Sequence, residues 1–349
     1  MDLPAGTRNF SYAQDMAIFR TKTHWVMLIV LLVVLSTGPL YWGNFWLGVA
    51  NLIGITIIAA TGLNILTGYC GQLSIGHAGF IAVGAYTSAI LTNRFELPFL
   101  VGLICAGLIA GFVGMLFGMP SLRVKGFYLA ISTIAAQFII IWIINQWADV
   151  TGGYNGIVAP IASIGGLQLK SQSSQYFLIL IIMVMVIFFA KNLARTRIGR
   201  AFVAIRDNDL AAEVMGINLF RYKLLAFFIG CFLAGIAGSL LAHWIGKVSP
   251  EHFSMTESIL YVGIIIIGGL GSTTGPIFGV IFIRMLQQGI SFLSPVLEST
   301  FALPAGFTTG IGPMVFGLII ILFLILEPRG ISHRWQLFKA SYRLWPFSY

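Results

Sequence analysis

The chain has 349 residues, of which 58% are hydrophobic and 9% are charged, whereas soluble domains carry about 25% charged residues. This deficit is too large for a water-facing surface and excludes a soluble enzyme or a soluble binding protein. The composition predicts an all-α polytopic membrane protein with a single membrane domain, in which the net charge of +9 has to be interpreted by location.

Hydropathy predicts ten membrane-spanning helices, because a span needs about 20 predominantly apolar residues. In chain order the predicted spans are 25–42, 45–66, 73–92, 97–118, 127–147, 176–193, 221–245, 256–270, 275–290 and 310–326. They divide the chain into an N-terminal segment at 1–24, a transmembrane domain at 25–326 and a C-terminal tail at 327–349.

The basic residues are distributed unevenly between the two sides of the predicted membrane domain. If the N-terminus is cytoplasmic, sixteen of the twenty lysines and arginines lie in the cytoplasm. Only Arg94, Lys170 and Lys247 lie outside, and Arg284 falls within the ninth span. Because cytoplasmic loops are enriched in Lys and Arg, this asymmetry predicts that both termini are cytoplasmic. Topology therefore accounts for the positive charge, so membrane lipid is an expected partner and nucleic acid is not.

The third span opens with the polar, glycine-rich stretch GYCGQLSIGHAGFIAVGAYTSAIL at 68–91. Its front end carries Gln72, Ser74 and His77, and is too polar for the middle of a lipid-facing helix. Irregular backbone is not tolerated against lipid, so it must lie against protein or a water-filled cavity. We therefore predict a helix break at 71–79 that borders a solute path.

Small residues follow the predicted break at helical spacing. Ala78, Ala82, Ala85 and Ala89 lie on one face, which predicts close packing against a neighbouring helix in the membrane. A second glycine-rich stretch, GGLGSTTGPIFG at 268–279, separates the eighth and ninth spans.

Several kinds of chemistry are not visible in the sequence. It contains no phosphate-binding loop of the type G-x-x-x-x-G-K-[ST] and no serine or cysteine nucleophile motif. Its five histidines and three cysteines show no metal-ligand spacing. Asp and Glu residues lie almost wholly in loops and at span ends, which argues against proton or sodium coupling. We therefore expect no catalytic residue, metal or cofactor in this chain, and an energy source in another subunit.

The longest predicted cytoplasmic segment, loop 194–220, joins the sixth and seventh spans. It reads as short amphipathic helices, the second of which contains AAEVMGI and ends at Gly216. A short, alanine-rich helix that is closed by glycine is suited to a groove on a partner protein.

At this point the chain resembles the membrane subunits of the ABC importers for branched-chain and other hydrophobic amino acids. The resemblance rests on six motifs in order, which cover most of the chain after residue 50: GYCGQLSIGHAGFIAVGAY at 68–86, KGFYLAISTIA at 125–135, TGGYNGI at 151–157, RAFVAIRDNDLAAEVMGINLFRYKLLAF at 200–227, GGLGS at 268–272 and LEPRGI at 326–331.

The resemblance implies an ABC importer permease fold in the inner membrane of a bacterium. It implies a heterodimer with a second, related permease, two ATPase subunits that bind ATP and Mg²⁺, and a periplasmic solute-binding protein. It also implies that loop 194–220 holds the helix that couples this chain to an ATPase. The residues expected to carry this coupling are Ala211, Ala212, Glu213, Gly216 and Ile217.

The expected substrate path consists of the predicted break together with nearby polar side chains. Its candidate residues are Asn64, Gly71, Gln72, Ser74, His77, Gly79, Thr133 and Gln137. A zwitterion needs polar groups for its carboxylate and its amine together with an apolar wall.

Alternative functions remain open at the level of sequence. A urea or short-amide ABC importer permease is the second reading, because that family is similar. An ion-coupled secondary transporter is disfavoured by the absence of deep acidic residues. A membrane scaffold or receptor would need no solute path and would leave the polar glycine break unexplained.

Overall fold

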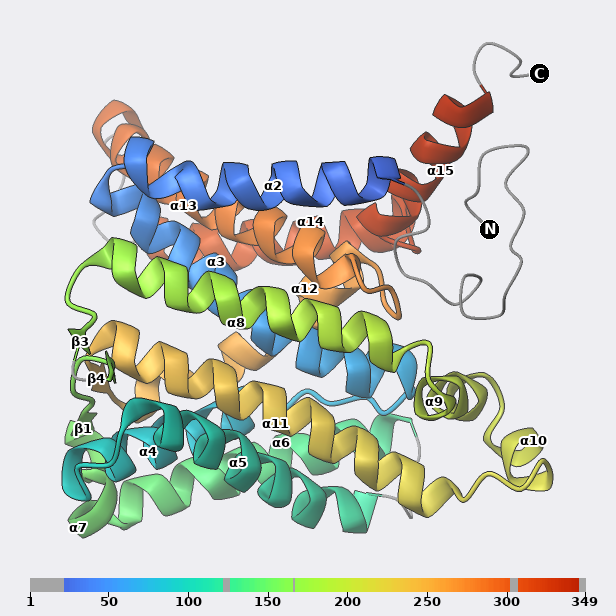
Figure 1. Ribbon diagram of the computed structural model, residues 1–349, viewed down its shortest axis with the longest axis horizontal. Helices are drawn as coiled ribbons and strands as arrows, with labels where there is room; N and C mark the ends of the chain where they lie inside the picture. The colour runs from blue at the N-terminus through green and yellow to red at the C-terminus, as the bar shows by residue number, and fades with distance from the viewer. Residues whose placement is uncertain (1–21, 122–125, 166, 302–306, 345–349) are drawn as a thin grey trace.

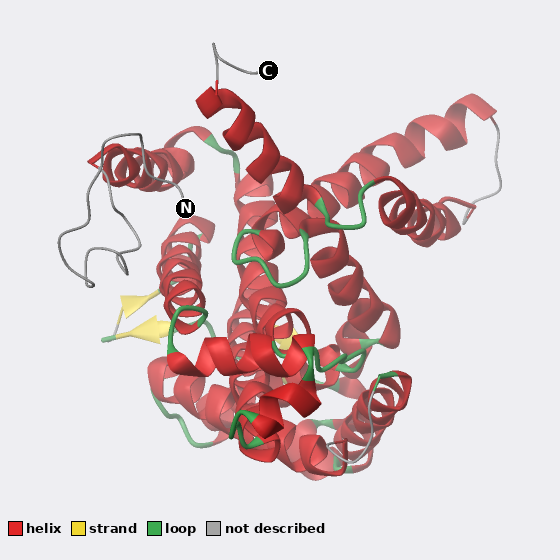
Figure 2. Ribbon diagram, turned by 90° about the vertical axis from the view of Figure 1, so that its right-hand side faces the viewer, coloured by secondary structure: helices red, strands yellow, loops and turns green. Residues whose placement is uncertain are grey.

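The computed structural model describes residues 22–121, 126–165, 167–301 and 307–344. The described chain is a bundle of long helices that run roughly parallel or antiparallel to one another (Figure 1). Figure 2 looks at the bundle from one end and shows that strands are few and short. The predicted N-terminal segment at 1–24 lies almost entirely outside the described residues, as do Arg123 and Lys125.

The first half of the bundle contains five long helices and an irregular segment. They are α2 (Lys22–Tyr41), α3 (Asn44–Leu63), which continues into the π-helix η1 (Asn64–Tyr69), α4 (His77–Arg94), α5 (Phe99–Ser121) and α6 (Phe127–Gln146). The second half contains α8 (Gln172–Leu193), α11 (Leu219–Ile245), α12 (Met255–Gly268), α13 (Gly275–Phe301), α14 (Phe307–Leu326) and α15 (Ile331–Leu344).

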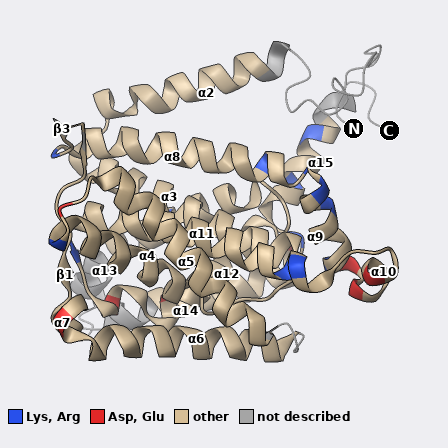
Figure 3. Cartoon of the chain, turned by 60° about the horizontal axis from the view of Figure 1, so that its bottom comes forward, with Lys and Arg blue, Asp and Glu red and all other residues tan. Residues whose placement is uncertain are grey.

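Shorter elements close the two ends of the bundle. One end holds α7 (Ala148–Thr151), the 3₁₀ helices η2 (Gly153–Asn155) and η3 (Pro250–Phe253), and two antiparallel strand pairs. In the first pair β1 (Ile157–Val158) joins β4 (Lys247–Val248), and in the second β2 (Ser163–Ile164) joins β3 (Leu167–Gln168). The opposite end holds α9 (Arg197–Asp207), α10 (Asp209–Val214) and α15 (Figures 1 and 3).

Each of the ten predicted spans coincides with a helix, but the count of ten spans is not confirmed. Within the described ranges, six helices are long and apolar enough to cross a membrane, or seven if the bent pair Gly312–Leu326 and Ile331–Ser341 is counted as one span. The apolar part of α2 has at most 17 residues, and α12 has 14. At 1.5 Å per residue α12 is about 21 Å long, which is shorter than the hydrocarbon core of about 30 Å.

The core of the bundle is α11, which packs against α3, α4 and α5. The predicted packing face of α4 is confirmed, because Ala78, Ala82, Ala85 and Ala89 are each at most 1% exposed. A Cβ atom on Gly84 would overlap the backbone of Gly235 on α11. Small residues therefore allow these backbones to touch, as helices in lipid require.

Helix starts follow ordinary capping chemistry. Ser171, Thr196, Asn208, Asn218 and Ser254 each accept a hydrogen bond from a backbone N–H in the first turn of the helix that follows. These caps fix the starts of α8, α9, α10, α11 and α12, because the first N–H groups of a helix have no partner within it.

Candidate functional site at the glycine-rich break

The end of α3 is the first unusual feature of the candidate site. The helix widens into the π-helix η1 and then becomes irregular from Cys70 to Gly76, before α4 starts at His77. We call residues 70–76 the break. The sequence predicted irregular backbone over 71–79, and its last part is wrong, because His77–Gly79 already belong to α4. Single-turn π segments occur frequently at functional sites.

The polar side chains at the break are buried within the chain. Ser74 and His77 are 0% exposed and Gln72 is 7% exposed, whereas Gly71 is exposed. The Nε2 atom of His77 lies 3.0 Å from the carbonyl oxygen of Ala59. Within the described residues, Ser74 Oγ and His77 Nδ1 have no hydrogen-bond partner. A buried polar atom without a partner costs about 1–3 kcal/mol, so these two atoms are candidates for a hydrogen bond to a solute or to water if the site opens.

Two predicted residues on α6 contact the break. The backbone N–H of Ile75 donates to Thr133 Oγ1 at 3.0 Å. Gln137 packs against Gly76, and its Nε2 donates to the carbonyl oxygen of Phe253 in η3 at 3.0 Å. A Cβ atom on Gly76 would overlap the carbonyl group of Thr133, so a glycine is needed where the break crosses α6. Gly79 likewise lies against the backbone of Gln137, which makes it a packing residue.

Ser258 on α12 belongs to the same hydrogen-bond network, although the sequence did not indicate it. Its Oγ accepts from the backbone N–H of Ala78 at 2.9 Å and donates to Gln137 Oε1 at 2.7 Å. Ser258 therefore joins α4, α6 and α12 at the start of α4. The role of Ser258 is not visible in the sequence, because a single serine in an apolar run is ordinary. Its partner Ala78 lies 180 residues earlier in the chain.

Asn64 does not join this network and instead connects the two glycine-rich stretches. Its Oδ1 accepts from the N–H of Gly271 at 2.9 Å, and its Nδ2 donates to the carbonyl oxygen of Ser272 at 2.8 Å. The backbone at Gly68 lies against Gly271 on the same side. The predicted path residues therefore form two groups, one around Ser74 and His77 and one around Asn64.

Arg206 connects loop 194–220 to the group of residues around Asn64. Its Nη1 atom donates to the carbonyl oxygen of Gly68 at 3.0 Å, which connects α9 to η1. Its other donors pair with the neighbouring Asp207. Sequence reasoning identified the loop but missed this contact, because an arginine in a charged amphipathic helix usually faces solvent.

The helix α10 projects from the end of the bundle (Figure 3). Leu210, Val214 and Met215 are 66%, 87% and 82% exposed. Lys223 Nζ lies 3.7 Å from Asp209 Oδ2 and ties the start of α10 to α11. Exposed apolar side chains on a tethered helix form a surface suited to a partner groove.

The predicted coupling residues are distributed over both faces of this region. Ala211, Glu213 and Gly216 are exposed and Ile217 is half-buried, but Ala212 is 3% exposed and faces the bundle. Ala212 is therefore not available to a partner in this conformation. Gly216 has a φ of +83°, as the turn after α10 requires. Leu210, Val214 and Met215 were missed, although all three stand within the quoted motif at 200–227.

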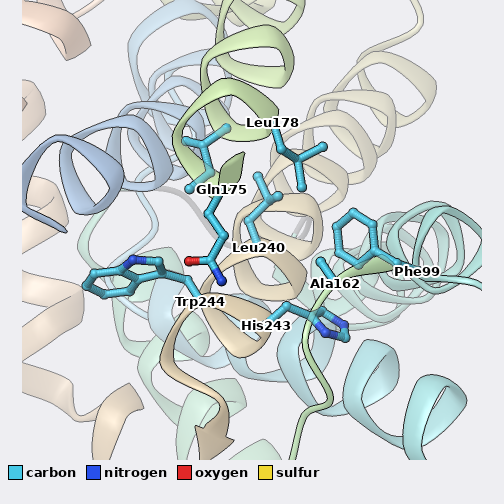
Figure 4. Close-up of a pocket in the computed structure, with 8 residues that line it drawn as sticks. Phe99, Ala162, Gln175, Leu178, Leu240, His243 and Trp244 are labelled. Atoms are coloured by element: carbon cyan, nitrogen blue, oxygen red, sulfur yellow. The ribbon is translucent and has the colours of Figure 1, made fainter. Parts of the chain in front are cut away.

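A second polar cluster lies toward the β1–β4 end of the bundle. His243 Nε2 lies 2.9 Å from Ser88 Oγ, and His243 Nδ1 lies 2.6 Å from the carbonyl oxygen of Pro160. Figure 4 shows the adjoining cavity between Phe99, Gln175 and Trp244. Its volume of about 10 Å³ admits about one water molecule. This cluster is therefore a satisfied structural network and not a solute site in this conformation.

Comparison with known proteins places these features in a family. The family model described as "Branched-chain amino acid transport system / permease component" matches residues 45–324. The "High-affinity branched-chain amino acid transport system permease protein LivM" of Escherichia coli (strain K12) is 34% identical over 287 residues, which cover 75% of this chain and 68% of the relative.

More distant relatives also match. A "Probable branched-chain amino acid transport permease protein LivM" from Methanocaldococcus jannaschii is 23% identical, over 80% of this chain and 90% of the relative. The "Ribose import permease protein RbsC" of Haemophilus influenzae is 22% identical, over 82% of this chain and 89% of the relative. No solved structure matches. The extent of the family match and the identity to the first relative show that this multi-pass membrane protein belongs to the family of permease components of branched-chain amino acid transport systems.

Proposed function

We propose that the chain is the transmembrane permease subunit of an ATP-driven importer for branched-chain or other hydrophobic amino acids. The Escherichia coli relative named as a branched-chain amino acid permease is 34% identical to this chain, against 22% for the ribose permease. That relative and the matching family model favour an amino acid over a sugar, and neither gives support to urea or short amides. The chain would form half of the translocation path, with a second, related permease forming the other half.

The observation that carries the proposal is the exposed apolar surface of α10. It stands at the end of the bundle where α9 and α15 concentrate basic side chains (Figure 3). By the positive-inside rule this end would face the cytoplasm, which supports cytoplasmic termini in the inner membrane of a bacterium. An ATPase subunit bound there would supply ATP, Mg²⁺ and hydrolysis, and two such subunits would serve the two permeases. A periplasmic solute-binding protein would dock at the β1–β4 end.

The break supplies the proposed path within this chain. Ser74 Oγ and His77 Nδ1 supply polar groups next to an unwound backbone, as broken helices do in other transporters. Asn64, Gln72, Thr133 and Gln137 fix the backbone around them by hydrogen bonds. Motion of α10 would reach the break through Arg206 and Gly68.

Reconstitution tests the proposal. The chain would be co-expressed with its neighbouring permease, ATPase and binding-protein genes, purified, and placed in proteoliposomes. Uptake of radiolabelled leucine that depends on internal ATP and on the binding protein is the expected result. Uptake of ribose or urea in place of leucine would show that the substrate is not an amino acid. Uptake without the ATPase subunits would refute ATP coupling.

A further inference from the structure

Arg284 is a charged residue inside a membrane-spanning helix. It lies in the interior of α13 (Gly275–Phe301), within the stretch Gly275–Leu293 that is long and apolar enough to cross a membrane. A cation at this depth costs at least about 2.5 kcal/mol and is retained where it pairs or serves a function. Solute sites of membrane transporters also lie near the midplane of the bilayer.

The guanidinium group of Arg284 is held in place by neutral side chains. Its Nε and Nη2 atoms donate to Thr56 Oγ1 at 3.2 and 3.1 Å, and its Nη1 atom donates to Gln287 Oε1 at 2.9 Å. The hydroxyl of Thr56 in turn donates to the carbonyl oxygen of Leu52 at 2.7 Å. These contacts fix the orientation of the guanidinium without neutralising its charge.

Within the described residues, the negative charge nearest to Arg284 is that of Glu257, in the first turn of α12, but the two groups are not in close contact. Glu257 Oε2 lies 4.0 Å from Arg284 Nη2, which is longer than the 2.7–2.9 Å typical of a charge-assisted hydrogen bond. The Glu257 side chain is 36% exposed and that of Arg284 is 11% exposed. The pair is therefore open on one side, with capacity left on both charged groups.

The pair adjoins the break. Tyr261 lies one turn after Glu257 on α12, and its ring packs edge-on against the ring of His77 at 6.1 Å. Ser258, the residue after Glu257, accepts the hydrogen bond from the N–H of Ala78. The same turn of α12 thus contacts the start of α4 with one side and Arg284 with the other.

We propose that Arg284 and Glu257 form the binding site for the charged backbone of a zwitterionic α-amino acid. The guanidinium would bind the carboxylate and the carboxylate of Glu257 would bind the ammonium group. Both charges of an α-amino acid are attached to one carbon, so the ligand presents a closely spaced pair of charges. With its carboxylate next to Arg284 and its ammonium group next to Glu257, the amino acid would pair with both side chains. It would add no net charge to the membrane interior. This inference rests on the proposed function and adds the chemical group that is recognised.

The test measures binding to the purified permease–ATPase assembly without the binding protein, so that this chain's own selectivity is observed. The probes are leucine, leucinamide, which lacks the carboxylate, and isocaproate, which lacks the ammonium group. Arg284→Gln should weaken leucine and isocaproate at least about 10-fold and leave leucinamide unchanged. Glu257→Gln should weaken leucine and leucinamide to the same extent and leave isocaproate unchanged. Equal effects of either variant on all three probes, or no effect, would overturn the site.

A double variant separates binding from folding. If the pair only neutralises Arg284, Arg284→Gln combined with Glu257→Gln should restore wild-type leucine binding, and that result would overturn the proposal. A binding site predicts that the double variant assembles with unchanged melting temperature of the complex but still binds leucine weakly. Arg334→Gln, which breaks the ion pair with Glu327 near the C-terminus, is the matched control and should change none of the three affinities.

The outcome is distinguishable from failure of the proposed function. If the wild-type reconstituted importer takes up no leucine with ATP and binding protein present, the proposed function fails. If the wild-type importer takes up leucine but both variants bind the three probes in the same order of affinity as the wild type, only the proposed binding site is refuted.

Discussion

Arg206 on α9 donates a hydrogen bond from Nη1 to the carbonyl oxygen of Gly68, 3.0 Å away and 138 residues earlier in the chain. The acceptor lies in the π-helix that leads into the break, and the donor lies one residue before the Asp207–Asn208 junction of α9 and α10. We therefore expect a displacement of α10 to act on the break through Arg206, which also packs against Gly71. Hydrogen bonds that involve a charged group contribute about 1.5–3 kcal/mol.

We expect Arg206→Ala to uncouple the importer. ATP hydrolysis should persist while leucine transported per ATP falls at least about 10-fold, because the contact is charge-assisted. The measurement is uptake and phosphate release in the same proteoliposomes. Arg200→Ala is the control, since its guanidinium is exposed and donates within the loop to Arg195. Unchanged coupling in Arg206→Ala would remove this contact from the transmission path.

The turn after α10 depends on the backbone conformation of Gly216. With φ at +83°, a β-branched residue is disfavoured by about 1–2 kcal/mol or more, whereas asparagine tolerates this region. Gly216→Val should reduce uptake strongly while the complex still inserts and assembles, and Gly216→Asn should retain most activity. The measurements are the amount of each variant in the membrane, by immunoblot, and its uptake rate. Normal uptake by the valine variant would exclude Gly216 from the mechanism.

The packing face of α4 should tolerate no larger side chain. Ala82 is 0% exposed, so Ala82→Leu must displace α4 from its neighbours and should lower the yield of assembled complex. Val83→Leu, at the adjacent half-buried position, should assemble normally. The measurement is the amount of monodisperse complex after size-exclusion chromatography, and equal yields for the two variants would contradict the packing argument.

The unpartnered atoms of Ser74, in the break, and of His77, at the start of α4, should matter for uptake more than for assembly. Ser74→Ala removes a buried hydroxyl that has no partner in the described chain, so it should not lower the melting temperature of the complex. His77→Ala removes one hydrogen bond to Ala59. Both variants should change the leucine uptake rate in assembled complexes. If uptake is normal, or fails only because the protein is lost from the membrane, the break is structural and does not border the path.

The orientation can be checked with reporter fusions. Fusions at residue 208, between α9 and α10, and at the C-terminus should both report the cytoplasm. A fusion at residue 165, between β2 and β3, should report the periplasm. A periplasmic signal at 208 would reverse the orientation and with it the assignment of loop 194–220 to the ATPase.

The sequence predicted the helices better than the contacts between them. Long apolar runs determine a helix in lipid without reference to the rest of the chain, so every predicted span coincides with a helix over most of its length. The predicted count of ten complete spans stays unconfirmed, since six or seven of the described helices are long and apolar enough to cross a membrane and α12 has only 14 residues. Burial of Ala212 was also not predictable, since neighbouring alanines look alike until the fold places one of them against the bundle.

The candidate site shows the same division. Ser74 and His77 were identifiable because polar residues among glycines are unusual in an apolar segment. Ser258 and Arg206 were not, because their roles arise from contacts across 180 and 138 residues. Glu257 and Arg284 belong to different helices, and only the fold brings them to 4.0 Å.

The bridge from Asn64 to Gly271 has a consequence for biosynthesis, because its two ends are 207 residues apart. At a synthesis rate of about 5–20 residues per second, roughly 10–40 s pass between the emergence of Asn64 and that of its acceptor and donor groups. Throughout this interval the amide of Asn64 is inserted without its final partners. The π-helix at the end of α3 therefore reaches its mature form only after α12 has been synthesised, so it is among the last described parts of the chain to be completed.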